Sequence, residues 1–271
     1  METLSIWQSL IIAIWIALVE GRAFGGTTLT LRFSPLMTGL VIGLVMGNVG
    51  LAMVTATILQ LIYLGVNSPG ATMAQEPAIG TTLAIPIVLM GNLSPVQAII
   101  VAIPVSIVGA YLYKYRFVVN DKIGKRTDAA IEELNHGEIS RSIILYPIIA
   151  SLILFVPLMF VLLQWVAPLI ASLLMGLEGT HAIHVLQVVV NGLIAVGIAT
   201  RIYVLGKQEY LLFFFLAYVL SIILQSLNVT MLSYAILGTL LAALYLLASQ
   251  KGAVATSGGS DFDEDDDDDD F

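Results

Sequence analysis

The sequence predicts an all-α, polytopic membrane protein that combines full transmembrane helices with short re-entrant or broken helical arms. Of its 271 residues, 58% are hydrophobic and only 11% are charged, and the mean hydropathy is +0.96. An ordinary soluble domain is about 45–50% apolar and about 25% charged, so these values exclude a soluble globular enzyme, a disordered chain and a nucleic-acid binder. The sequence also contains several apolar runs separated by short polar breaks, which is the pattern of a chain that crosses a membrane more than once.

The net charge of −8 belongs to the C-terminal end of the chain. Nine of the nineteen acids lie within residues 261–271, and without them ten acids face eleven bases. Residues 251–271 are rich first in Gly, Ser and Ala and then in Asp, which predicts a disordered acidic tail. We interpret it as a solubilising tail, with an electrostatic contact for a basic partner domain as the alternative.

Two apolar segments open the chain. Ile6–Val19 predicts a helix that ends at Glu20, and the polar connection Gly21–Arg32 separates it from a second apolar stretch, Leu36–Gly65. Asn48 and Gly50 interrupt this stretch, and the apolar pattern resumes from Leu51 to Leu64.

Three glycines of the second stretch recur at helical spacing. Gly39, Gly43 and Gly47 stand at i, i+4 and i+8, which makes a flat helix face against which another backbone packs closely. The alternative is that glycine is simply common in membrane helices. We interpret the three as helix-packing residues.

A polar segment between two short apolar arms is the most informative feature. Leu51–Leu64 and Ala78–Met90 are each too short for an ordinary span of about 20 residues. The segment between them, residues 65–77, is rich in Gly, Pro and polar side chains. Irregular backbone at membrane depth is tolerated only where protein or a water-filled cavity satisfies it, and in transporters it usually marks the substrate site.

The middle of the chain carries the one substantial hydrophilic stretch of the body. A span is predicted to run from Ser94 to Tyr113. Residues 114–141 then hold six of the eleven bases, which predicts a cytoplasmic loop by the positive-inside rule. Within it, Asp128–Leu134 is a candidate for a short surface helix.

Five apolar segments follow the basic loop. Ser142–Gln164 predicts a span, Trp165–Leu177 a shorter arm and His181–Tyr203 another span. Tyr210–Leu227 and Val229–Leu247 predict a closing helical hairpin. Four crossings return the C-terminal tail to the cytoplasmic side, since acids weigh little in orientation.

The candidate site lies in the polar segment and in the arm before it. Ionisable residues among apolar spans are functional candidates by default, and Glu76 is the foremost of them. Carboxylate, amide and hydroxyl groups beside glycines are what a polyol ligand needs. The same groups could coordinate a sodium ion. The alternative without a functional role is a polar loop that lies in water outside the membrane. We predict a substrate-binding site formed by Gln60, Asn67, Ser68, Gly70, Gln75 and Glu76.

No chemistry of its own is evident in the chain. There is no cysteine and no phosphate-binding glycine loop, and no Ser–His–Asp arrangement can be argued. His181 and His184 stand at i, i+3, but they are more simply explained as an interfacial pair than as metal ligands. We therefore expect no catalytic residue, no metal and no cofactor, and transport that draws its energy from a partner protein or an ion gradient.

The sequence resembles the membrane IIC component of the mannose/fructose/sorbose family of the bacterial phosphoenolpyruvate-dependent sugar phosphotransferase system. The resemblance covers about residues 1–250 and rests on the order and spacing of several blocks: Pro35–Gly47, Ala56–Gly65, Asn67–Ala71 leading to Glu76-Pro77, Asn191–Gly197 and Lys207–Phe215. It implies one IIC-type transport domain, residues 1–250, whose helical halves 1–113 and 142–250 flank the basic loop.

The resemblance also implies an assembly. The IIC chain would pair with a IID membrane subunit in a trimer of heterodimers within the lipid of the bacterial cytoplasmic membrane. It would bind a hexose or amino sugar and move it by an elevator-like shift. Soluble IIA and IIB proteins would relay the phosphate, so that this subunit is an enzyme only by convention.

Carried over residue by residue, Glu76 matches the acidic or amide position of the family's sugar-site loop, and Gly65 and Gly70 match its glycines. Gln60 falls where many mannose-type members carry glutamate, which favours another hexose or an amino sugar over mannose. Two other functions stay open: an ion-coupled secondary transporter that works alone, and a membrane scaffold that transports nothing.

Overall fold

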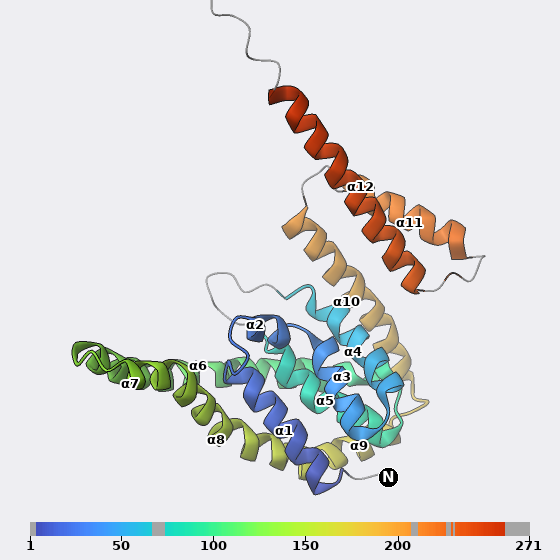
Figure 1. The fold of residues 1–271 in the computed structure, drawn as a ribbon. Helices are drawn as coiled ribbons and strands as arrows, with labels where there is room; N and C mark the ends of the chain where they lie inside the picture. The colour runs from blue at the N-terminus through green and yellow to red at the C-terminus, as the bar shows by residue number, and fades with distance from the viewer. Residues whose placement is uncertain (1–3, 67–73, 207–210, 226–228, 230, 258–271) are drawn as a thin grey trace, which may run out of the picture. The chain divides into compact units, whose positions relative to one another are not determined.

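The computed structural model describes residues 4–66, 74–206, 211–225, 229 and 231–257, and the described residues are helical with short connections (Figure 1). They divide into two units, Met1–Val204 and Leu205–Phe271. The helices of the first unit are α1 (Ile6–Glu20), α2 (Thr27–Arg32), α3 (Pro35–Met46), α4 (Val49–Tyr63), α5 (Pro77–Gly91), α6 (Ala98–Glu132), α7 (His136–Ser140), α8 (Tyr146–Val161), α9 (Ala167–Gly176) and α10 (His181–Leu205).

Long and short apolar helices coexist in this unit. In the part of the chain that the structure describes, three helical runs are long and apolar enough to cross a membrane: Pro95–Glu132, His136–Gly176 and His181–Val204. Helices α1, α3, α4 and α5 are apolar but shorter. The predicted fold class, all-α with full-length helices and short helical arms, is confirmed for the described residues.

Local sequence signals set the ends of the short helices. Ser5 and Gln8 form a reciprocal capping box at the start of α1. Gly47 ends α3 with φ +75, a conformation that costs glycine little, and the Asn48 side chain caps α4 by accepting from the Leu51 N–H. Pro77 opens α5 at a position where its missing N–H is not needed. The breaks between helices are thus encoded residue by residue.

The predicted glycine face lies largely where α3 packs on α4. A Cβ added at Gly39 would lie 2.4 Å from the Cβ of Ala56, and one at Gly43 would lie 2.8 Å from the Cβ of Ala52. Gly47, the third glycine of the predicted face, differs: nothing lies within 4 Å of an added Cβ there, because the residue terminates the helix. Two glycines therefore set the distance between the helices, and the third sets the length of α3.

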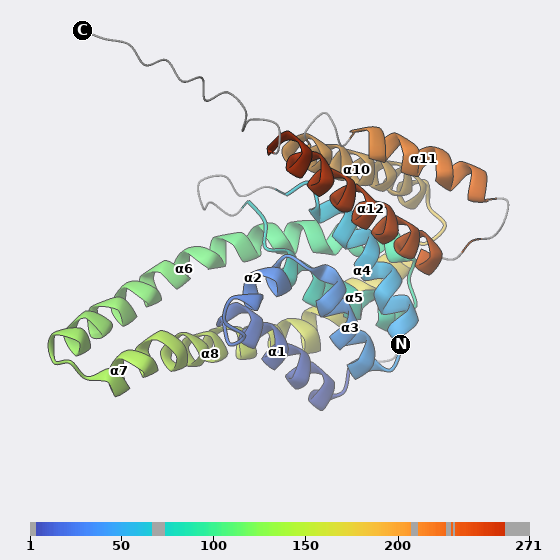
Figure 2. The ribbon, with the colours of Figure 1, turned by 45° about the horizontal axis from the view of Figure 1, so that its top comes forward.

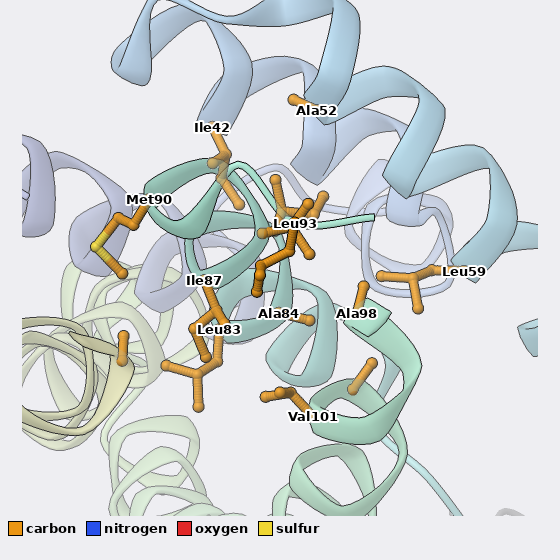
Figure 3. Packing of buried hydrophobic residues seen from close by; sticks show 14 of the residues in the cluster. Ile42, Ala52, Leu59, Leu83, Ala84, Ile87, Met90, Leu93, Ala98 and Val101 are labelled. Carbon is orange, nitrogen blue, oxygen red and sulfur yellow. The ribbon is translucent and has the colours of Figure 1, made fainter. Parts of the chain in front are cut away.

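Helix α5 lies at the centre of the core. All of its residues except Leu89 and Gly91 are buried, and it contacts α3, α4, α6 and α9. Figure 3 shows Leu83, Ala84 and Ile87 of α5 among side chains from α3, α4 and α6. This burial explains the absence of a polar face on α5: protein surrounds the helix on every side.

Residues 114–141 differ from the prediction of a loop. Helix α6 continues without a break to Glu132, and α7 then turns the chain into α8, so that α6 and α8 run side by side as a helical hairpin (Figure 2). The stretch from 114 to 132 contains no proline, and Asp121 and Lys125 form an i,i+4 ion pair of 2.9 Å on it. The stretch is therefore a polar helix, and the prediction of a loop, which rested on its hydrophilic composition, is wrong for these residues.

The segment after the hairpin is also more continuous than predicted. Two π-helical turns, Arg141–Leu145 and Leu162–Val166, join α7, α8 and α9 into a single helical run that ends at Gly176. The predicted separate arm Trp165–Leu177 is therefore the last part of this run.

The second unit holds α11 (Leu211–Gln225) and α12 (Met231–Ser257). The rings of Phe213 and Tyr245 meet edge to face, with centroids 5.1 Å apart. Helix α12 extends beyond residue 250, where the disordered tail was predicted to begin, and the rest of that tail, residues 258–271, lies outside the described residues.

Candidate functional site

Three charged side chains are buried among the described residues of the first unit. Glu20, Arg32 and Glu76 are each about 1% exposed. Glu20 is the last residue of α1, Arg32 is the last residue of α2, and Glu76 immediately precedes α5. Helix ends thus bring together charges that lie far apart in the sequence.

These residues form one chain of alternating charge. Arg32 holds the Glu76 carboxylate with two bonds, Nε to Oε1 at 3.1 Å and Nη2 to Oε2 at 2.5 Å. The same Nε lies 3.5 Å from Oε2 of Glu20, and Nη1 of Arg116 donates to that oxygen at 2.6 Å. We call Arg116, Glu20, Arg32 and Glu76 the buried charge chain.

The composition of the buried charge chain explains why four helices can enclose it. Two guanidinium groups face two carboxylates, so that the formal charge is zero. A single buried ion without a partner costs several kcal/mol, whereas paired and hydrogen-bonded ions offset much of that cost. The bidentate contact between Arg32 and Glu76 is the geometry that guanidinium and carboxylate favour. Each member is therefore needed to neutralise another.

Helix α6 fixes the backbone of Glu76. The Glu76 N–H donates to the Ser106 carbonyl at 2.9 Å, and a Cβ added at Gly109 would lie 3.1 Å from the Cβ of Glu76. A further tie joins the neighbouring helices, since the Tyr63 hydroxyl donates to the Ala102 carbonyl at 2.9 Å. The start of α5 is thus held by α6 and by Arg32, and α4 is tied to α6.

The predicted site residue Gln60, on α4, contacts the backbone next to Arg32. Its Nε2 donates to the Phe33 carbonyl at 3.4 Å, and Phe33 follows Arg32 directly. Its Oε1 is buried and has no hydrogen-bond partner among the described residues. A buried acceptor without a donor costs about 1–3 kcal/mol, so this oxygen is suited to receive a donor from a ligand.

The remaining predicted site residues have different outcomes. Gln75 is half-buried and precedes Glu76. Asn67, Ser68 and Gly70 lie outside the described residues. Glu76 was expected to offer an open carboxylate in a polar tip, but Arg32 holds it. A carboxylate has about four acceptor positions, and the two bonds from Arg32 leave capacity for a ligand hydroxyl.

Sequence reasoning missed three members of the buried charge chain. Glu20 had been interpreted as the end of a span, Arg32 as part of a polar connection and Arg116 as one base of a cytoplasmic loop. A signal was present: outside the tail the acids and bases nearly balance, and charges within a membrane protein tend to pair with one another. Which charges pair depends on the tertiary fold.

Helix α10 approaches the end of α4 through two glycines. A Cβ added at Gly197 would lie 2.5 Å from the Leu61 carbonyl oxygen, and one at Gly65 would lie 3.2 Å from the Cα of Gly197. Gly65 begins the polar segment that contains the predicted site. Backbone contact here fixes the position of α10 beside the start of that segment.

The described part of the chain contains no set of side chains that could bind a metal ion. No group of three or more His, Cys, Asp or Glu side chains is close enough there to hold a metal ion. The two carboxylates of the buried charge chain face arginines instead. The arrangement is suited to hydrogen bonding of a neutral polar ligand.

Comparison with known proteins gives consistent matches. Residues 6–244 match the family described as the PTS system sorbose-specific IIC component. The sorbose-specific EIIC component of the phosphotransferase system of Klebsiella pneumoniae is 24% identical over 212 residues, which are 78% of each chain.

Solved structures share the fold. One is described only as a membrane protein; it has 20% identity and a TM-score of 0.65, and the match covers 90% of this chain and 96% of the other. Another is the mannose transporter ManYZ in complex with microcin E492, with 18% identity, a TM-score of 0.55 and coverage of 91% and 97%. The family match over most of its length shows that this chain belongs to the sorbose-specific IIC family of the sugar phosphotransferase system, as a membrane subunit of a sugar permease.

Proposed function

We propose that this subunit binds a hexose or an amino sugar and carries it across the membrane by an elevator-like shift, for phosphorylation by a partner IIB protein at the cytoplasmic face. The observation that carries the proposal is the break between α4 and α5: on one side, α4 carries the unpartnered Oε1 of Gln60, and on the other, Arg32 holds the Glu76 carboxylate at the start of α5. Such a break within a membrane protein usually marks a substrate site.

The proposed sugar site consists of Gln60, Asn67, Ser68, Gly70, Gln75 and Glu76. Gln60 would accept from a sugar hydroxyl through its unpartnered Oε1, and Glu76 would accept from another through the capacity that Arg32 leaves. Fixed acceptors favour a ligand rich in hydroxyl groups, because each group can donate. Sorbose and mannose, which appear in the names of similar proteins, have this chemistry.

The proposed partners follow from the family. A IID membrane subunit would complete the permease, as a trimer of IIC–IID heterodimers in the bacterial cytoplasmic membrane, and soluble IIA and IIB would deliver the phosphate. The hydrophilic end of the α6–α8 hairpin, which carries six bases in residues 114–141, supports a cytoplasmic position for that end. The C-terminal tail would lie on the same side.

The test is sugar uptake by cells that express the chain with its family partners. Gln60→Ala removes the unpartnered acceptor, and we expect a rise in the KM for uptake with normal amounts of the chain in the membrane. Thr57→Ala is the matched control, since Thr57 is exposed on the same helix and its hydroxyl donates to the Met53 carbonyl of its own helix. Equal uptake by the Gln60→Ala variant and the wild type would remove Gln60 from the site.

The requirement for phosphoenolpyruvate separates this function from ion-coupled transport. Membrane vesicles should accumulate sugar only when phosphoenolpyruvate and the partner proteins are present. Accumulation by the chain alone, driven by a sodium or proton gradient, would contradict the proposal.

A further inference from the structure

An open groove of about 370 Å³ runs between helices α6 and α8 of the hairpin. Four residues of each helix line it, and on both helices they follow the spacing i, i+3, i+4, i+7 that defines one helix face. They are Val119, Lys122, Ile123 and Arg126 of α6, and Tyr146, Ile149, Ala150 and Ile153 of α8. We call these eight residues the hairpin groove.

The hairpin groove changes from polar to apolar along its length. Lys122, Arg126 and Tyr146 lie toward its hydrophilic end, and Val119 and Ile153 lie toward the apolar part of the hairpin. Each wall spans eight residues, which is roughly 10 Å of helix. The α8 wall changes from Tyr146 to isoleucine over this distance, as a membrane changes between its headgroups and its hydrocarbon, and the α6 wall presents its two cations between Val119 and Ile123 and beyond.

The polar end carries a net positive charge. Arg126 lies over the Tyr146 ring, 5.0 Å from its centroid, and its Nε donates to Glu138 at 2.7 Å. The Tyr146 hydroxyl donates to the same Glu138 oxygen at 2.6 Å. Glu138 therefore offsets Arg126, and Lys122 makes no ion pair within the part of the chain that the structure describes. The ammonium of Lys122 supplies the excess charge.

The apolar end is open to its surroundings. Ile153 is 70% exposed, and Ile149 is also exposed. In a chain of this membrane family, exposed isoleucines between two helices contact lipid or another protein. The cations at the other end decide between these occupants, because charge complementarity favours a molecule with an anionic head and an apolar tail.

We propose that the hairpin groove binds one anionic phospholipid. Its phosphate lies against Lys122 and Arg126, with the Tyr146 ring beside the headgroup at the depth where aromatic residues gather. An acyl chain follows Ile123, Ile149 and Ile153 toward the hydrocarbon. The proposal rests on the hairpin alone and is independent of the sugar site.

The experiment measures lipid binding to the full-length chain purified in detergent. Phosphatidylglycerol and phosphatidylcholine are added in turn, and bound lipid is counted by native mass spectrometry. We expect a preference for phosphatidylglycerol that weakens as salt is raised. Lys122→Gln should weaken phosphatidylglycerol binding about fivefold, the factor for one basic residue near an anionic lipid surface.

Two matched pairs locate the site. Lys125→Gln serves as the control for Lys122→Gln, because Lys125 is exposed on the same helix outside the groove and pairs with Asp121. Ile153→Gln should weaken binding of both lipids, whereas Val161→Gln, also exposed on α8 but outside the groove, should leave binding unchanged. All four side chains are solvent- or lipid-facing, so folding is retained.

Three results would overturn the proposal. One is equal binding of the two lipids by the wild type. Another is an effect of Lys125→Gln as large as that of Lys122→Gln. The last is loss of a co-expressed membrane partner from the Ile153→Gln variant with lipid binding intact, which would make the groove a protein interface. Inorganic phosphate at the same concentration should not displace the lipid, because it lacks the chain.

Discussion

Removing one member of the Arg32–Glu76 pair should cost more stability than removing both. Arg32→Gln leaves the Glu76 carboxylate buried without a cation, and Glu76→Gln leaves Arg32 to share Glu20 with Arg116. Breaking a buried ion pair on one side typically costs about 3–5 kcal/mol. In the double variant the pair of Arg116 and Glu20, 2.6 Å apart, is still complete and neutral. We therefore expect the double variant to lose less than either single variant.

The assay is unfolding of the detergent-solubilised chain followed by circular dichroism, for wild type, both single variants and the double variant. The control cycle uses Asp121 and Lys125, which are 2.9 Å apart but about two-thirds and three-quarters exposed. An exposed i,i+4 pair contributes only about 0.3–0.5 kcal/mol, so this cycle should show almost no coupling. If the losses of the two buried single variants simply add in the double variant, the charge-balance reasoning is wrong.

Three further variants probe the packing by the same unfolding assay. Gly39→Ala should lower the free energy of unfolding by about 1–3 kcal/mol, because its Cβ would lie 2.4 Å from another Cβ; Gly50→Ala, with open space around it, should not. Gly197→Ala should be similarly destabilising, and Gly192→Ala on the same helix is its control because nothing lies near an added Cβ there. If a variant and its control lost equal stability, the close approach of the helices at Gly39 or Gly197 would be contradicted. Tyr63→Phe should cost about 0.5–1.5 kcal/mol for one lost hydrogen bond, and an unchanged unfolding curve would show that this bond adds nothing.

Much of the fold could be predicted from local signals. The breaks at Asn48 and before Pro77 follow from a capping side chain and a helix-opening proline, and such signals act over a few residues. The extent of α6 could not be predicted in this way. Polar composition in residues 114–132 is compatible with a loop or with a helix, and the contacts of α6 with α7 and α8 decide between them.

The candidate site was predictable only in part. Glu76 and Gln60 stand out because polar residues are scarce near the break. Their neighbours could not be identified, since Glu20, Arg32 and Arg116 each lie near a polar segment of the sequence and look like ordinary flanking charges. Pairing across 96 residues, as between Glu20 and Arg116, leaves no local pattern.

The buried charge chain has a consequence for how the protein is made. When α1 and α2 leave the ribosome, Glu20 and Arg32 have only each other, and Glu76 and Arg116 are synthesised later. Uncompensated charge is costly within a bilayer. We therefore expect the first helices to reach their final depth only after α6 has been synthesised as far as Arg116. Roughly the first two-fifths of the chain would then enter the lipid together.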